Sequence, residues 1–335
     1  MKTEIAPAEE RAKATERAVE LLQKGEVVAL PTETVYGLAA DALNAEAVAK
    51  IFEAKERPRF DPLIVHLPDR EWLEKVTQLP APDRELILKL IDRFWPGPLT
   101  LVLPRRSIVP EIVTAGLDTV AVRISAHPIF SEIIRAFGSP LAAPSANRFG
   151  RVSPTTAQHV LDELEGRIPL IVDAGRTTHG VESTIVAVHE GIIDILRQGP
   201  ITDEELSTFG QVDVISFAKE LSAPGQLPSH YAPKTPLLLI ENAKSISPAS
   251  NQKIGLIAWN PIESEKHFVA VRRLSVGGDL REAATNLFRH LRELDALNLD
   301  LIVAERVPES GLGAAIMDRL RRAAHRQIDG PEKPE

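Results

Sequence analysis

The sequence predicts an α/β protein with two domains. The chain has 335 residues, more than one compact core usually takes. Short apolar runs alternate with helix-forming segments along its length. Residues 222–236 contain four prolines and a glycine, too irregular for a helix or a central strand. We therefore expect a catalytic domain at 1–210, a linker at 211–236 and a smaller domain at 237–335.

The first domain is expected to alternate strands with helices. An amphipathic helix at 7–24 should stop at Gly25. The remaining assignments rest on apolar runs bounded by prolines and glycines, and on segments rich in helix formers. Strands are expected at 27–30, 63–67, 99–103, 120–124, 141–143, 170–172, 185–188 and 192–196, and helices at 45–55, 83–94, 128–137 and 155–164.

The same patterns continue after the linker and predict a small second α/β domain. No internal repeat relates the two domains, so we expect two different units. Strands are expected at 237–240, 254–259, 268–274 and 301–307, with helices at 280–294 and 312–324.

Composition narrows the possible functions. The chain has no cysteine, which excludes disulfides, thiolate zinc sites and a cysteine nucleophile. Residues 1–10 are polar and no run of 18 apolar residues occurs, so we expect no signal peptide, no membrane span and a cytoplasmic protein. The net charge of -8 opposes broad nucleic-acid binding and leaves room only for weak or local RNA contact.

Polar residues follow the first expected strand. Thr32, Glu33, Thr34 and Tyr36 lie just after it, where loops of open α/β sheets present polar groups to ligands. The alternative is a capped turn, because hydroxyl and carboxylate side chains often satisfy free backbone N–H groups.

Two cations, Lys55 and Arg57, lie at the end of an expected helix. They could complement the helix dipole or bind a polyphosphate. His66 should point to the opposite face from Leu63 and Val65, as a structural residue or as a contact for a small polar substrate. Arg123 interrupts an apolar strand and needs an anion, either an internal carboxylate or that of a substrate.

Hydroxyl and amide groups recur further along the chain, and each also has a structural interpretation. Ser153 before Pro154 is a typical helix N-cap signal. No G-x-S-x-G elbow surrounds Ser145, which disfavours a serine hydrolase. Both common phosphate-binding glycine motifs are missing, so an ATP site would have to use clustered arginines and hydroxyls instead. Ser145, Asn147 and Ser153 could bind phosphate or adenine, whereas Ser183, Thr184 and Arg197 are each unremarkable alone.

Several stretches, taken in order, resemble the YrdC-like family of threonylcarbamoyl-AMP synthases in its long two-domain form. The matching stretches are LPTETVYGLAADA, KERPRFDPLIVH, WPGPLTLVL, VAVRIS, APSAN, VESTIV and ILRQG, which together cover about 27–199. PGQLPSHYAP resembles the interdomain linker of that long form. The resemblance implies a twisted α/β catalytic sheet followed by a smaller Rossmann-like C-terminal domain.

The resemblance also implies roles for particular residues. Threonine would be bound by Thr34, His66, Arg123 and Ser183, with Arg123 on its carboxylate. Tyr231 in the linker would fold over the nucleotide, so that the second domain acts as a lid. Asp61 departs from the family, which usually has Asn there, and its charge should weaken ATP binding unless cations offset it. The implied ATP-binding set is Lys55, Arg57, Asp61, Thr119, Ser145, Asn147, Ser153, Arg197 and Tyr231.

The reaction implied by the resemblance joins L-threonine, bicarbonate or CO2 and ATP into L-threonylcarbamoyl-AMP, with release of pyrophosphate. No covalent nucleophile is needed, and Lys55 and Arg57 would stabilise charge in the transition state. Mg2+ would enter with ATP, with no organic cofactor. The product would pass to a tRNA threonylcarbamoyl transferase, which modifies position 37 of tRNA.

Two alternatives differ from this interpretation. Related carbamoyltransferases of hydrogenase maturation carry zinc-finger cysteines, which this chain lacks. A double-stranded RNA-binding module without synthase activity is disfavoured by the net charge and by the lack of an aromatic RNA-reading motif.

Overall fold

The computed structural model describes residues 2–215, 224, 231–246, 252–261 and 265–325. It divides the chain into two compact units, one of Met1–Phe149 with Ser153–Gln226 and one of Gly150–Val152 with Leu227–Glu335. Of the expected linker, residues 216–223 and 225–230 lie outside the described part.

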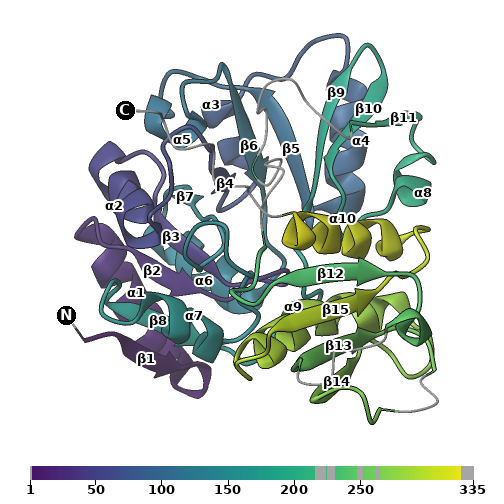
Figure 1. The fold of residues 1–335 in the computed structure, drawn as a ribbon. Helices are drawn as coiled ribbons and strands as arrows, with labels where there is room; N and C mark the ends of the chain where they lie inside the picture. The colour runs from purple at the N-terminus through teal and green to yellow at the C-terminus, as the bar shows by residue number, and fades with distance from the viewer. Residues whose placement is uncertain (1, 216–223, 225–230, 247–251, 262–264, 326–335) are drawn as a thin grey trace, which may run out of the picture. The chain divides into compact units, whose positions relative to one another are not determined.

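The first unit is built on a mixed sheet (Figure 1). The described residues form 11 strands in the order β1-β8-β2-β3-β7-β4-β6-β5-β9-β10-β11. The strands are β1 (Glu4–Pro7), β2 (Val28–Leu30), β3 (Gly37–Asp41), β4 (Ile64–His66), β5 (Leu99–Pro104), β6 (Thr119–Arg123), β7 (Leu141–Ala142), β8 (Leu170–Asp173), β9 (Thr184–His189), β10 (Ile192–Arg197) and β11 (Gln211–Val214).

Helices of the first unit begin and end at residues suited to those positions. The side chain of Asn44 accepts hydrogen bonds from the first turn of α2, and Gly138 ends α6 in the left-handed conformation. The helices are η1 (Ala8–Glu10), α1 (Arg11–Gln23), α2 (Ala45–Lys55), η2 (Arg70–Trp72), α3 (Leu73–Val76), α4 (Arg84–Phe94), α5 (Glu111–Thr114), α6 (Pro128–Phe137), α7 (Ala157–Leu164) and α8 (Asp203–Leu206).

Apolar side chains cover both faces of this sheet. Val65 and Val122 belong to a large core cluster, whereas Phe130 of α6 and Leu22 of α1 belong to a second cluster. Because side chains alternate along a strand, His66 points away from the cluster that holds Val65. This orientation agrees with the sequence prediction, and it brings the ring of His66 against Phe130.

Three strands of this sheet were not predicted: β1, β3 and β11. β3 has the sequence GLAAD, and glycine and alanine have low strand propensity. The expected helix at 7–24 becomes an α-helix only at Arg11, because Pro7 ends β1 and a 3-10 turn follows. β11 falls within the range expected for the linker and pairs with β10 in parallel.

The second unit contains a parallel sheet with the strand order β12-β15-β13-β14. Its strands are β12 (Leu237–Ile240), β13 (Ile254–Ala258), β14 (Ala270–Arg273) and β15 (Leu301–Glu305), with η3 (Ala243–Ser245), α9 (Leu280–Asp295) and α10 (Leu312–Ala324). α9 and α10 contact each other, and α10 packs against β12 (Figure 1). The predicted class, a large α/β sheet domain followed by a smaller α/β domain, is confirmed.

Candidate functional site

The four residues expected to bind threonine gather at one edge of the large sheet. His66 and Arg123 end the neighbouring parallel strands β4 and β6 and lie directly opposite each other. β5 runs antiparallel to β6 and parallel to β9, so the first residues of β5 and β9 lie at this same edge. Ser183 immediately precedes β9, and Thr34 reaches the edge from the loop between β2 and β3.

Arg123 is buried and has an internal anionic partner. Its Nη1 donates to Oε1 of Glu33 at 3.1 Å, and its Nη2 donates to Oγ1 of Thr34 at 3.3 Å. Burial lowers the pKa of Arg123, and the Glu33 carboxylate opposes that shift. Internal pairing, one of the two predicted possibilities, is therefore present, and it leaves part of the guanidinium for a ligand.

His66 is fully buried beside Arg123. Its ring centroid lies 4.7 Å from that of Phe130, and its Nδ1 has no hydrogen-bond partner in the described part of the chain. Burial lowers the pKa of His66 well below its usual value, and the charge of Arg123 lowers it further. The imidazole is therefore neutral at pH 7, with Nδ1 free to bond a small polar ligand.

Arg197 connects the end of β10 to the start of β9. Its Nε donates to the carbonyl oxygen of Ser183 at 3.0 Å, and its Nη2 donates to the Ser183 hydroxyl, also at 3.0 Å. That hydroxyl lies 2.8 Å from Oγ1 of Thr100 on β5. Since Leu101 pairs with Val122, Thr100 lies across from Arg123. Ser183 thus joins Arg197 to the edge that carries Arg123.

Lys55 is held by backbone carbonyls. Its side chain is 1% exposed, and Nζ donates to the carbonyl oxygens of Ser145 and Asn147, both at 2.5 Å. Burial lowers the pKa of Lys55 well below its usual value, with a further lowering from the Arg57 charge. In this structure Lys55 fixes the 145–147 loop, and it does so from the last residue of α2.

Arg57 and Asp61 form a buried ion pair with an Nη2 to Oδ2 distance of 2.9 Å. Arg57 also donates to the carbonyl oxygens of Asp61, at 3.2 Å, and Pro62, at 2.8 Å. Burial raises the pKa of Asp61, while the charges of Arg57, Lys55 and Arg197 act in the opposite direction. Three of the predicted ATP-binding cations thus surround one carboxylate.

The remaining predicted residues are less closely joined. Ser153 donates to the carboxylate of Glu182, next to Ser183. Thr119 begins β6, where it pairs with Pro104. Tyr231 belongs to the second unit, where its ring lies 5.5 Å from that of Phe288.

Four residues outside the predicted threonine-binding and ATP-binding sets join this network, and three of them, Glu33, Thr100 and Glu182, bond directly to members of those sets. Glu33 and Ser125 meet at the end of β6, Thr100 bonds to Ser183, and Glu182 bonds to Ser153. Glu33 stood within the polar cluster after β2, so its motif carried a signal. Its partner 90 positions away did not follow from that motif.

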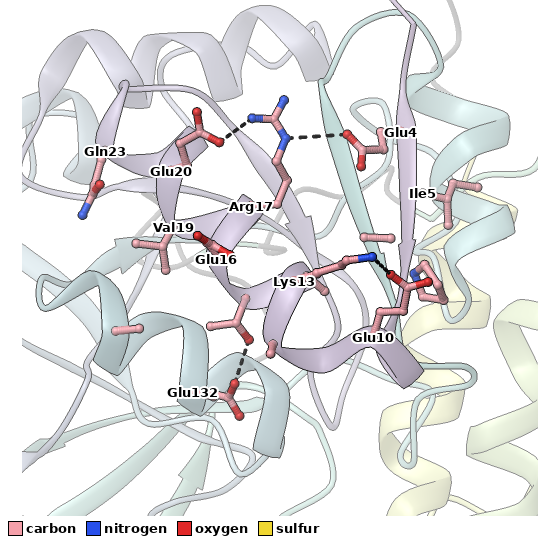
Figure 2. A pocket seen from close by; sticks show the side chains of 16 residues that line it. Glu4, Ile5, Glu10, Lys13, Glu16, Arg17, Val19, Glu20, Gln23 and Glu132 are labelled. Carbon is pink, nitrogen blue, oxygen red and sulfur yellow. Dashed lines mark hydrogen bonds and ion pairs between the residues drawn. The ribbon is translucent and has the colours of Figure 1, made fainter.

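A surface pocket of about 840 Å3 is lined by none of these residues. Figure 2 shows side chains that line it. Charged side chains of β1 and α1 line it, including Arg17, which is 3.6 Å from Glu4, and Lys13, which is 2.8 Å from Glu10. These side chains are largely exposed, and none belongs to the predicted site. The pocket is therefore separate from the candidate site.

No group of three or more His, Asp or Glu side chains in the described ranges is arranged to hold a metal ion. No helix in those ranges has both the length and the apolar content needed to cross a membrane.

Comparisons with known proteins match both parts of the chain to described families. Residues 20–199 match the Sua5, YciO and YrdC family, described as "Telomere recombination", and residues 201–325 match "Threonylcarbamoyl-AMP synthase, C-terminal domain". A threonylcarbamoyl-AMP synthase of Pyrococcus abyssi is 40% identical, covering 93% of this chain and 94% of the relative. One from Bacillus subtilis is 41% identical, covering 92% of each.

A solved structure is also similar over nearly the whole chain. The crystal structure of P. abyssi Sua5 complexed with L-threonine has a TM-score of 0.87 and 38% identity, covering 96% of this chain and 98% of that one. The chain therefore belongs to the Sua5-type family of threonylcarbamoyl-AMP synthases.

Proposed function

We propose that this protein makes L-threonylcarbamoyl-AMP from L-threonine, bicarbonate-derived CO2 and MgATP, with release of pyrophosphate. The observation that carries the proposal is the meeting, within one unit, of two buried groups of residues. One holds Arg123, Thr34 and His66 at a sheet edge. The other holds the cations around Asp61, and the Arg197–Ser183 pair connects the two. The sequenced relatives and the threonine-bound structure of P. abyssi Sua5 support the same activity.

On the threonine side, the chemistry requires orientation of a small zwitterion. Arg123 can bind the carboxylate through two N–H groups, because its planar guanidinium matches carboxylate geometry. The neutral His66 and the hydroxyls of Thr34 and Ser183 can bond the polar groups of threonine without adding charge. The free amine then takes up CO2 and loses a proton, which gives a carbamate.

At the nucleotide, the reaction depends mainly on positioning of the reacting groups and on stabilisation of charge. An oxygen of the carbamate attacks the α-phosphorus of MgATP, and the bond to the bridging oxygen breaks, so that pyrophosphate leaves with the bonding electrons. Arg57 and Arg197 offset the charge that Asp61 would otherwise add beside the phosphates. Lys55 contributes by holding the loop that carries Ser145 and Asn147. No side chain becomes covalently attached.

Four further inferences, on magnesium, the next enzyme, the location and Tyr231, follow from this activity. Mg2+ is supplied with ATP as part of the substrate. The mixed anhydride in the product hydrolyses readily, so a tRNA threonylcarbamoyl transferase should take it up soon after synthesis, and both proteins should work in the cytoplasm. Tyr231 is proposed to fold over the nucleotide, as the family resemblance implies.

The test measures pyrophosphate release from MgATP with isotopically labelled bicarbonate and each of several amino acids. We expect release that depends on L-threonine, together with a labelled threonylcarbamoyl-AMP product identified by mass spectrometry. Serine and valine are controls that remove the methyl group and the hydroxyl group. Pyrophosphate release that ignores threonine, or no labelled adenylate, would refute the proposal.

A further inference from the structure

Glu33 is a buried carboxylate for which the reaction above requires no chemistry. It lies in the loop between β2 and β3 and is 6% exposed. One oxygen accepts Nη1–H of Arg123 at 3.1 Å, and the other accepts the hydroxyl of Ser125 just beyond the same strand. The backbone at Ala126 adds another hydrogen bond. Glu33 therefore fastens its loop to the end of β6.

The three nitrogens of the Arg123 guanidinium differ in the partners that they already have. Nη1 is bound by Glu33, and one N–H of Nη2 is bound by Thr34. Nε is buried and has no hydrogen-bond partner among the residues that the structure describes. A carboxylate that binds an arginine through two parallel bonds can use the Nε and Nη2 edge. Glu33 bonds to Nη1, which is not part of this edge, and so does not compete with a ligand for Nε.

Glu33 is ionised, as a residue that holds an arginine in place should be. Burial alone would raise its pKa, but the charge of Arg123 and the hydrogen bonds from Ser125 and the backbone outweigh burial, so the pKa is lowered. A carboxylate that is ionised and bonded through both oxygens is poorly placed to remove a proton from the threonine amine. These contacts therefore favour a role for Glu33 in orienting Arg123 over a role in proton transfer.

We propose that Glu33 is a positioning residue, which holds Arg123 so that its Nε edge faces the carboxylate of threonine. The proposal rests on the proposed function, in which Arg123 binds that carboxylate. Without the negative charge of Glu33, Arg123 would lose its ionic partner and could rotate toward the remaining acceptors. Threonine binding should then weaken far more than ATP binding.

The experiment compares steady-state kinetics of five full-length proteins: wild type, Glu33→Gln, Glu33→Asp, Ser125→Ala and Glu132→Gln. Glu132 is the matched control, because it is also a glutamate bonded to an arginine and a hydroxyl, Arg11 and Thr15, but it lies on α6 beside the surface pocket of Figure 2. We expect Glu33→Gln to raise the KM for threonine about tenfold or more, the effect of losing one charge-assisted hydrogen bond. The KM for ATP should change less than about twofold, and Glu132→Gln should match wild type.

The milder variants keep the test decisive if Glu33→Gln fails to fold. Ser125→Ala removes one bond to Glu33 and retains its charge, so the KM for threonine should rise about two- to fivefold. Glu33→Asp keeps the charge and should be closer to wild type than Glu33→Gln is. Equal changes in the KM values for threonine and ATP, or an unchanged threonine KM in both Glu33→Gln and Ser125→Ala, would overturn the proposal.

A sixth protein distinguishes a failure of the Glu33 proposal from a failure of the proposed threonine-binding role of Arg123. Arg123→Lys keeps the positive charge but removes the planar pair of donors. If its threonine KM rises while that of Glu33→Gln does not, Arg123 binds threonine without help from Glu33. If Arg123→Lys also leaves the threonine KM unchanged, the assignment of Arg123 to the substrate carboxylate is itself wrong.

Discussion

Replacing Lys55 by methionine tests whether this buried lysine holds the 145–147 loop. The change removes the donor to the carbonyl oxygens of Ser145 and Asn147 and keeps most of the side-chain volume. Each buried carbonyl left without a donor costs about 1–3 kcal/mol, so the gross loss is about 2–6 kcal/mol. Methionine also relieves the cost of burying an ammonium group, whose pKa is strongly lowered, so we expect a net loss of about 2–3 kcal/mol.

The measurement is urea unfolding followed by a signal from the first unit. With an m-value of about 3 kcal/mol/M, the expected loss lowers the transition midpoint by about 1 M. Lys50→Met is the control, because Lys50 lies on the same helix and pairs with Glu26 while 39% exposed. That variant should lose at most about 1 kcal/mol. If the two variants unfold at the same urea concentration, the carbonyl contacts of Lys55 do not stabilise the loop.

Three other predictions concern single residues. Burial lowers the pKa of His66, so the unfolded chain binds a proton at a higher pH than the folded chain does, and the stability contribution of His66 is lost progressively below about pH 6.5. The urea midpoints at pH 7.5 and pH 5.5 should therefore differ more in wild type than in His66→Gln. An equal difference would contradict the direction of the pKa shift. Asp61→Asn removes a negative charge from among three cations, so the KM for ATP should fall several-fold at low salt and less at high salt; a raised KM would mean that the Asp61 charge is needed to hold Arg57. Glu305 in the second unit accepts hydrogen bonds from the backbone N–H groups of Ala243, Trp259 and Asn260. Glu305→Gln should therefore speed hydrogen exchange of these three amides by about tenfold or more. Unchanged exchange rates would show that the carboxylate is dispensable.

Much of the fold followed from local pattern. The helices at 45–55, 128–137 and 312–324 have the predicted limits, because their apolar spacing and end residues agree. β3 was missed because GLAAD has little intrinsic strand preference and becomes a strand by pairing with β2 and β7. β1 and β11 pair in parallel with β8 and β10, and local pattern did not predict such pairings.

The chemistry of the site divides in the same way. The sequence by itself determined which groups are available: a buried arginine in β6 that needs an anion, a histidine on the face opposite Val65, and cations at the end of α2. The alternation of side chains along a strand and the positions of helix ends depend on neighbouring residues, so both can be predicted from local sequence.

Only the tertiary structure decided which partners these groups take. Glu33 meets Arg123 across 90 positions, and Lys55 meets the carbonyl of Asn147 across 92. A buried charge must find a partner, but burial does not specify which one, since every polar group brought to the same sheet edge competes for it. The order of the strands settles that competition, and it depends on pairings between segments far apart in the chain.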